Sequence, residues 1–279
     1  FGLLPKAKDA TVKNIGIINS DVIVTSICNG RGDTLAGLII GKAYSSDTGT
    51  VRVENCFADA TAAVTSKNTA GAVIGADSGN LTVNNCYSYA KLTGKYIGMI
   101  GDVWANVNNE TFKDIIVKNS YAVGYSVARN DSSVVTNIPS KKAGNFTYEN
   151  LYSTVKPYSG SAGTITGVTR LHRDDMIDIY ASATMEGLDS SVWTFEANKL
   201  PYLTAFADYT ASKVEFAAEI GDVNCDGSIN GTDLAALRKQ LLGITEVENK
   251  RASDTHRDND VDLLDLIALK KAVAAAPAE

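Results

Sequence analysis

Two stretches near the C-terminus combine the residue types and the spacing of a calcium-binding loop. They run from Asp222 to Asp233 and from Asp254 to Asp265. A twelve-residue loop binds Ca²⁺ through oxygen atoms at positions 1, 3, 5, 7, 9 and 12, and glycine at position 6 allows the sharp turn. The first stretch meets every requirement, since Gly227 stands at position 6 and oxygen-bearing residues stand at the other positions.

We therefore predict two Ca²⁺ sites, of which the second is the weaker. The candidate ligands are Asp222, Asn224, Asp226, Ser228, Asn230 and Asp233 in the first loop, and Asp254, His256, Asp258, Asp260, Asp262 and Asp265 in the second. His256 weakens the second loop because imidazole suits softer metals than Ca²⁺. Asn259 replaces the turn glycine, which asparagine tolerates better than most residues. An acidic surface without metal is the alternative, and it carries more weight for the second loop.

A helix is expected after each loop. Residues 32 positions apart match over both loops and the segments that follow, which indicates a duplication. The predicted apolar stripes, which would pack one helix on the other, are Leu234, Leu237 and Leu241 in the first copy and Leu266, Leu269 and Val273 in the second. The segment before the first loop is too short for a helix, so each copy is a loop followed by one helix. Ile229, at loop position 8, is expected to point into the core.

This segment, roughly residues 219–276, resembles a type I-like dockerin. Dockerins are small calcium-dependent modules that attach proteins to cohesin modules of a cellulosome-type scaffold. In that family, cohesin recognition falls mainly on loop positions 10 and 11 and on a basic pair in the helix. The partner-binding residues that the resemblance implies are Gly231, Thr232, Leu234, Arg238, Lys239, Leu263, Leu264, Lys270 and Lys271. One face is small and polar and the other aliphatic, so a single preferred orientation on the cohesin is expected.

A second repeat occupies the chain upstream of about residue 210. Each unit begins with a strand of alternating residues. The strand ends in asparagine, then cysteine or serine, then an aromatic residue, and a glycine-containing apolar run follows. Cys56, Cys86 and Ser120 hold equivalent places at steps of 30 and 34 residues. Such short units bury a core only when stacked, so we predict a right-handed parallel β-helix of about five coils. An antiparallel sandwich is the alternative, because strand signals alone do not separate the two.

These repeats resemble the GLUG-type repeats of large bacterial surface proteins. We expect a helix over 171–183 and a strand containing Trp193 to cover the last coil. The predicted fold is therefore mainly β: a right-handed parallel β-helix with a C-terminal capping helix in domain 1–210, followed by a small all-α calcium-binding dockerin in domain 211–279.

Cysteine usage and charge restrict the location and the partners. Cys56 and Cys86 are expected to stack as reduced thiols, because equivalent positions in neighbouring coils suit disulfide geometry badly. Cys28 has no evident partner and Cys225 lies on a loop, so free thiols favour a secreted protein of an anaerobic bacterium. The net charge of −6 and pI of about 5.1 give no support to nucleic-acid binding. No apolar run is long enough for membrane insertion. The chain starts at Phe1 without an initiator methionine or a signal peptide, so we expect it to be a mature fragment or an expressed portion of a longer protein.

No catalytic residue is assigned. The acids of residues 1–170 are scattered singly, whereas a polysaccharide lyase or glycosidase needs clustered or paired carboxylates. The dense run His172-Arg173-Asp174-Asp175 with Asp178 lies at an expected helix start, where capping is the simpler interpretation. The tripeptide Arg31-Gly32-Asp33 is interpreted as a coincidence.

Repeat aromatics pose one further alternative. Tyrosines recur at Tyr87, Tyr89, Tyr96, Tyr121, Tyr125 and Tyr152. They are either a core ladder or a strip that stacks on plant polysaccharide, and periodicity alone does not tell the two apart. We therefore expect a non-catalytic extracellular protein whose dockerin binds cohesin and whose β-helix is structural, adhesive or carbohydrate-binding. A β-helix lyase or hydrolase delivered by the same dockerin is the alternative.

Overall fold

The computed structural model describes most of the chain in two compact units. The described residues are 1–24, 35–77, 79–94, 96–101, 114–123, 126–128, 145–154, 159–160, 163–164, 167–177, 180–210, 213, 220–247, 249–258 and 260–275. The first unit comprises Phe1–Arg170, Glu186–Thr194 and Tyr202–Lys213, and the second comprises Leu171–Met185, Phe195–Pro201 and Val214–Glu279. Cys28, the tripeptide 31–33, Tyr125, Asp178 and Asn259 lie outside the described residues.

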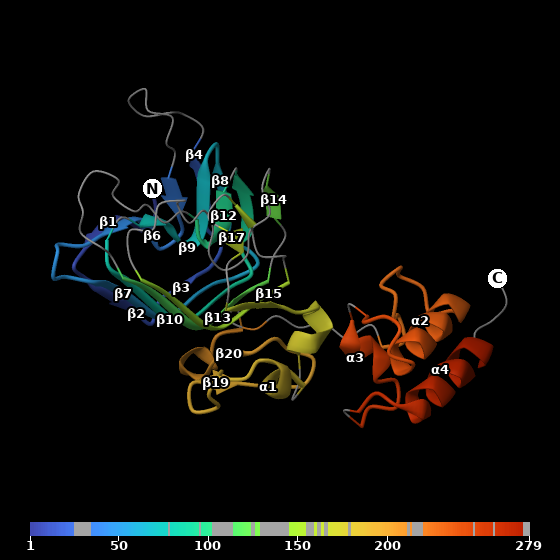
Figure 1. The fold of residues 1–279 in the computed structure, drawn as a ribbon. Coiled ribbons are helices and arrows are strands. Elements are labelled where there is room, and N and C mark those ends of the chain that lie inside the picture. Colours follow the sequence, from blue (N-terminus) through green and yellow to red (C-terminus); the bar gives the residue numbers. More distant parts are fainter. Residues whose placement is uncertain are drawn as a thin grey trace. The chain divides into compact units, whose positions relative to one another are not determined.

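Three parallel sheets build the first unit (Figure 1). One has the order β1 (Leu4–Lys8), β6 (Ile40–Tyr44), β9 (Thr69–Asp77), β12 (Tyr96–Ile100), with β5 (Leu35–Gly37) also paired to β9. The largest has the order β18 (Val168–Arg170), β15 (Phe146–Ser153), β13 (Ile115–Ala122), β10 (Leu81–Ser88), β7 (Val51–Ala58), β2 (Thr11–Lys13), with β3 (Gly16–Ile17) beside β7. The third has the order β14 (Ser126–Ala128), β11 (Lys91–Gly94), β8 (Ala63–Ser66), β4 (Asp21–Val24).

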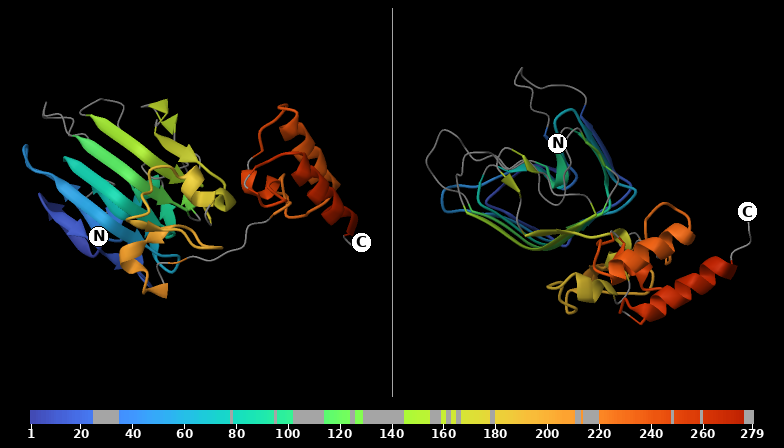
Figure 2. Two further views of the ribbon diagram at one scale, coloured as in Figure 1. Left: turned by 90° about the horizontal axis from the view of Figure 1, so that it is seen from below. Right: turned by 45° about the vertical axis from the view of Figure 1, so that its right-hand side comes forward.

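From β6 to β14, consecutive strands fall in different sheets, so the chain winds in coils. β7, β8 and β9 lie in the largest, third and first sheets, and β10, β11 and β12 repeat the same order. Figure 2 shows the strands of successive coils lying side by side. Pairing within these sheets is parallel, for example Val53 with Val83 and Cys86 with Cys56. The antiparallel sandwich considered from the sequence is therefore wrong.

An asparagine in each coil bends the long strand of the largest sheet. Asn14, Asn55, Asn85, Asn119 and Asn150 have φ between 49° and 56°, a left-handed conformation that asparagine adopts more readily than most residues. Their side chains also link the coils, since Asn85 Nδ2 donates to Asn55 Oδ1 at 3.3 Å and Asn150 Nδ2 to Asn119 Oδ1 at 2.8 Å. This requirement explains why asparagine precedes the cysteine or serine in the repeat.

The glycine-containing runs of the repeat allow two backbones to approach closely. Gly37 and Gly71 are partners in adjacent strands. A Cβ atom at Gly37 would lie 2.4 Å from the backbone nitrogen of Gly75 in the adjacent strand β9. Any side chain larger than hydrogen would therefore force the strand to shift.

Like residues stack in the core of the first unit. Cys56 and Cys86 are register partners, fully buried and free, as predicted. Burial raises the pKa of the Cys86 thiol, which keeps this sulfur protonated and unreactive. Phe57 and Tyr121 stack on either side of Tyr87, with ring centroids 5.1 and 5.5 Å away and interplanar angles of 8° and 10°.

Four of the repeat tyrosines lie in the core. Tyr87 and Tyr121 are fully buried, and Tyr89 and Tyr152 are 6% and 5% exposed. The strip proposed for sugar stacking is therefore inaccessible at these four positions, since stacking on a sugar needs an open ring face.

The expected cap differs from the prediction in two respects. The helix over 171–183 is a 3-10 helix, η1 (Arg173–Met176), and a short helix, α1 (Tyr180–Thr184). Asp174, Asp175, Met176 and Ile177 are all buried, and four consecutive buried residues do not fit one helix face. Trp193 covers the aromatic ladder rather than the last coil, since its ring lies 5.7 Å from Tyr87 and 5.6 Å from Tyr121.

The remaining elements are short. β16 (Ser159–Gly160) pairs with β17 (Gly163–Thr164), β19 (Trp193–Thr194) pairs with β20 (Tyr202–Leu203), and η2 (Thr204–Phe206) follows. The second unit holds α2 (Gly231–Leu241), α3 (Lys250–Ser253) and α4 (Leu263–Ala275). Among the described residues, no helix combines the length and apolarity required to cross a membrane.

Candidate functional site

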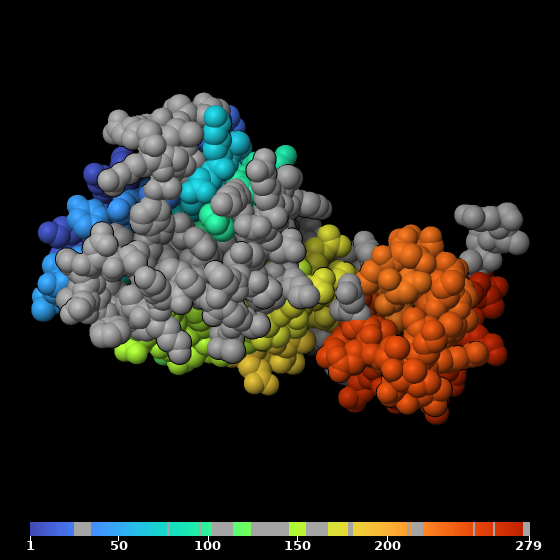
Figure 3. Space-filling model, turned by 45° about the horizontal axis from the view of Figure 1, so that its top comes forward, coloured from blue at the N-terminus to red at the C-terminus, as the bar shows by residue number. Residues whose placement is uncertain are grey.

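The two predicted loops precede two helices that pack through one small apolar core. α2 follows the first loop and α4 the second, as predicted. Val223, Leu237 and Leu269 are buried between them, and the other stripe residues pack around these three. In the space-filling view this part of the chain forms one closely packed orange-to-red body (Figure 3). Ile229, by contrast, is 45% exposed, so its expected inward position was wrong.

The carboxylate at loop position 12 ties the loop together in the same way in both copies. Asp233 accepts from the Asn224 N–H at 3.2 Å and from the Asn230 N–H at 2.8 Å. Asp265 accepts from the His256 N–H at 2.8 Å and from the Asp262 N–H at 2.7 Å. Both carboxylates are fully buried. Positions 3, 9 and 12 are thereby held together in each loop.

Positions 5 and 9 also repeat their contacts. Asp226 and Asp258 each accept from the N–H two residues ahead, at 2.9 and 3.1 Å. Asn230 and Asp262 accept from the N–H of Thr232 and Leu264, at 2.8 and 2.6 Å. The Asn230 contact is part of a capping box that begins α2. The duplication read from the sequence is therefore also a duplication of hydrogen bonds.

The two loops also differ at position 1. The two carboxylate oxygens of Asp222 accept from the Asp226 N–H at 3.1 Å and from the Gly227 N–H at 3.0 Å. Asp254 keeps the first contact, with the Asp258 N–H at 3.1 Å, but its other oxygen accepts from Arg251 Nη1 at 2.9 Å. A cationic side chain thus contacts the first carboxylate of the second loop.

The donor set suits a hard cation. Asp222 is 3% exposed, and Asp233, Asp254 and Asp265 are fully buried. Burial of a carboxylate is costly unless a counter-charge or hydrogen bonds compensate it, and the partners of Asp222 and Asp233 described above are backbone N–H groups. Within the described residues, no three His, Cys, Asp or Glu side chains converge as a metal-holding group. The ligand assignments therefore stay predictions that rest on loop spacing and buried oxygen atoms.

The candidate recognition residues are exposed, with one exception. Leu263 is 68% exposed and Leu264 is 47% exposed. Leu234, in contrast, is half-buried against the core of the helix pair. The other candidates, all exposed, are Gly231, Thr232, Arg238, Lys239, Lys270 and Lys271.

Sequence reasoning missed one exposed apolar residue on α4. Ile267 is 50% exposed and lies one helical turn after Leu263 and Leu264. The corresponding residue of α2 is Ala235. The aliphatic surface of the second copy is therefore larger than loop positions 10 and 11 alone imply.

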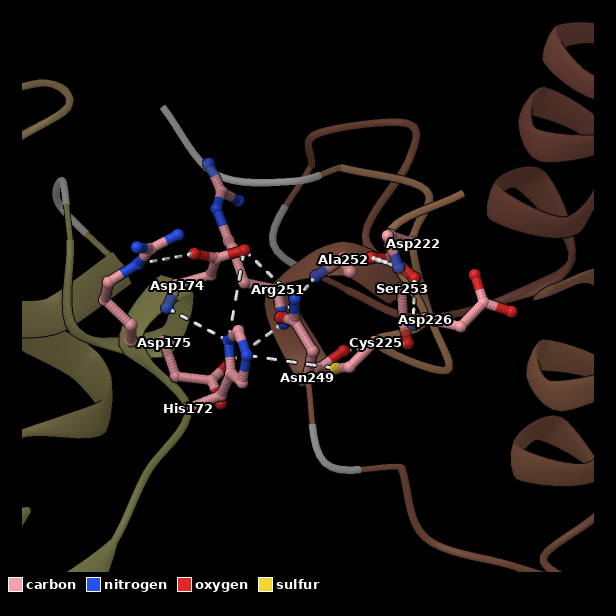
Figure 4. Close-up of polar contacts among 12 residues, drawn as sticks. His172, Asp174, Asp175, Asp222, Cys225, Asp226, Asn249, Arg251, Ala252 and Ser253 are labelled. Atoms are coloured by element: carbon pink, nitrogen blue, oxygen red, sulfur yellow. Dashed lines mark hydrogen bonds and ion pairs between the residues drawn. The ribbon is translucent and has the colours of Figure 1, made fainter. Parts of the chain in front are cut away.

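Sequence reasoning also missed the partners of the acidic run before α1. His172 does cap η1, because its side chain accepts from the Asp174 N–H. Asp174 Oδ2 accepts instead from Asn249 Nδ2 at 3.0 Å, and Asp175 Oδ1 accepts from the Arg251 N–H at 2.8 Å (Figure 4). Helix capping therefore accounts for His172 only, and the two carboxylates bind the N-terminal end of α3. No pattern with a short period could have indicated these contacts, because they join residues 75 and 76 positions apart.

A comparison with protein-family models assigns the second unit's helical part. The family described as "Dockerin type I domain" matches residues 220–274. The chain carries a dockerin type I domain. A dockerin domain implies a cohesin partner, calcium binding and an extracellular component of cellulosome type. The GLUG-like resemblance of the upstream repeats is not confirmed by a family match. Comparisons with curated proteins and with solved structures gave no match.

Proposed function

We propose that this protein is a non-catalytic, secreted component of a cellulosome-type assembly, attached to a cohesin on a scaffold or cell surface by its dockerin in a Ca²⁺-dependent manner. The observation that carries the proposal is the duplicated hydrogen-bond scheme of the two loops. It holds positions 3, 9 and 12 together in both copies and leads directly into α2 and α4, which present the exposed candidate residues.

In this proposal each loop holds one calcium ion, and the second loop holds it more weakly. The ligands are those predicted at positions 1, 3, 5, 7, 9 and 12. When bound, Ca²⁺ would supply the positive charge that balances the carboxylates of the loop. The chain's own contribution is positional: the buried Asp233 and Asp265 fix the backbone of each loop through two N–H groups. His256 weakens the second site because it offers nitrogen in place of oxygen.

The two copies offer different surfaces to a cohesin. Leu263, Leu264 and Ile267 form an exposed aliphatic patch at the start of α4. Gly231, Thr232 and Ala235 stand at the matching positions of α2. Burial of apolar area is favourable in proportion to that area. We therefore assign the main contact to the second copy and expect one preferred orientation.

The upstream domain, 1–210, is proposed to be a right-handed parallel β-helix with a structural or adhesive role, and residues 211–279 are the proposed dockerin domain. The three parallel sheets of the upstream domain, and the regular passage of the chain between them, support the coil architecture. Several of its acids have structural contacts, as when Asp9 accepts from the Ser46 N–H and Asp114 from Asn145 Nδ2. The buried free thiols Cys56 and Cys86 support secretion into an anaerobic environment.

Calorimetric titration of a cohesin panel against the full chain tests the proposal. Binding is expected with Ca²⁺ and is expected to be lost with EDTA. The double variant Asp222→Ala with Asp226→Ala is expected to lose binding, because both residues supply ligands to the stronger site. The variant Asp189→Ala, at an exposed acid of the first unit, is the control and should bind as the unaltered chain does. Cohesin binding by the double variant in EDTA would contradict the proposal.

A further inference from the structure

The first carboxylate of the second loop is bonded to a guanidinium. Asp254 is fully buried, and Arg251, 11% exposed, donates from Nη1 to Asp254 Oδ2 at 2.9 Å. In the first loop, the corresponding oxygen of Asp222 accepts from the turn glycine, Gly227, at 3.0 Å. The residue that corresponds to Arg251 by the offset of 32 is Glu219, an acid. The sequence of the first copy therefore does not repeat this arginine.

Arg251 is held in place by its neighbours. Its backbone N–H donates to Asp175 Oδ1 at 2.8 Å. The residue that caps α3, Asn249, is fully buried, accepts from the Ala252 N–H at 2.9 Å and donates to Asp174 Oδ2 at 3.0 Å. Figure 4 shows these residues gathered around the N-terminal end of α3. α3 ends at Ser253, directly before Asp254. Because α3 is held in place, the Arg251 guanidinium is positioned beside the first carboxylate of the loop.

We propose that Arg251 is a built-in cation of the second loop, which supplies part of the positive charge that calcium supplies in the first loop. This inference rests on the proposed calcium-dependent dockerin function. Two consequences follow from the contact. The second loop keeps its fold at low calcium, because its buried position-1 carboxylate already has a counter-charge. Calcium binds there more weakly, because the incoming ion must share Asp254 with a positive group that is already in place.

Calcium titration of the full chain by calorimetry tests the second consequence. The unaltered chain is expected to show one strong site and one weak site. Arg251→Gln is expected to tighten the weak site by about tenfold or more, the change that corresponds to loss of a hydrogen bond to a charged group. Arg257→Gln is the matched control, because Arg257 is an exposed arginine of the same loop and the substitution removes the same charge. The control should change the weak site by about threefold or less, as expected for a solvent-exposed charge.

Thermal unfolding without calcium tests the first consequence. In EDTA, Arg251→Gln is expected to lower the unfolding midpoint of the dockerin, whereas Arg257→Gln leaves it unchanged. Arg251→Lys keeps the charge and is expected to retain more of the EDTA stability than Arg251→Gln. If Arg251→Gln leaves the dockerin unfolded in EDTA, no midpoint can be measured there. Saturating Ca²⁺ is then expected to restore the helix band of the far-UV circular dichroism spectrum.

The two proposals fail in different ways. If Arg251→Gln and Arg257→Gln give equal second-site affinities and equal EDTA midpoints, the role of Arg251 is overturned while the calcium-dependent dockerin stands. If neither the unaltered chain nor any variant binds calcium, both proposals are overturned. If the unaltered chain shows one site and Arg251→Gln shows two, the role of Arg251 is supported in its strongest form.

Discussion

The buried carboxylate that closes the second loop gives the sharpest prediction on stability. Asp265 uses one oxygen for the His256 N–H and the other for the Asp262 N–H. In Asp265→Asn, one of these oxygens becomes an NH₂ group, so one backbone N–H faces a donor in either orientation of the amide. A polar group that loses its partner costs about 1–3 kcal/mol when buried. The residue is fully buried but its N–H partners are partly exposed, so we expect about 1–2 kcal/mol.

Urea unfolding of the full chain in EDTA measures this effect. EDTA removes the contribution of Asp265 as a calcium ligand, and the helix band of far-UV circular dichroism reports the unit that contains α2 and α4. With a slope of about 1–2 kcal/mol per M urea, the midpoint should fall by about 1 M. Asp260→Asn, an exposed acid of the same loop, should stay within about 0.5 kcal/mol of the unaltered chain. Equal midpoints for the two variants would refute the structural role of the Asp265 contacts.

Three further predictions concern recognition and pH. Substituting the basic pairs 238–239 and 270–271 separately by alanine should weaken cohesin binding unequally, with the larger loss at 270–271. Calorimetry measures both losses, and equal losses would rule out one preferred orientation. Ile267→Ala should weaken cohesin binding by about tenfold, because burying that side chain contributes about 1.5–3 kcal/mol, while the dockerin should unfold at an unchanged temperature. Burial raises the pKa of the Asp175 carboxyl above its ordinary value, so the folded state binds its proton more readily, and stability should fall as pH rises from the ordinary value through the raised one. Asp175→Asn, which keeps the acceptor for the Arg251 N–H, should lack this part of the pH dependence in thermal unfolding.

Local spacing in the sequence was sufficient to predict most of the loop pair. The offset of 32 placed the helices after each loop, and the stripe that contains Leu237 and Leu269 became the core of the helix pair. These features depend on contacts between residues near in sequence or on one helix face, which a periodic pattern records directly. The parallel pairing of the repeats was predictable for a similar reason, because equivalent residues such as Cys56 and Cys86 stack in register.

Contacts between distant segments escaped prediction. Nothing local indicates that Asp175 binds the backbone of Arg251, or that Trp193 lies against Tyr87 and Tyr121. Ile229 was misjudged because its position in an ordinary loop favours the core, whereas here Val223, Leu237 and Leu269 fill that core. In each case the outcome depends on how side chains pack in three dimensions, which a local sequence pattern does not record.

The departures of the second loop from the calcium pattern become coherent once Arg251 is considered. His256 removes an oxygen at position 3, and Asn259 stands in place of the turn glycine. Both changes weaken a metal site, and a loop of buried carboxylates with a weak metal site would lose stability. Arg251 donates to the Asp254 oxygen that corresponds to the one bonded by Gly227 in the first loop, and Asp174 and Asp175 bind the first residues of α3. His256 and the Arg251 contact thus fall on the same loop, and we therefore propose that the second copy depends less on calcium than the first.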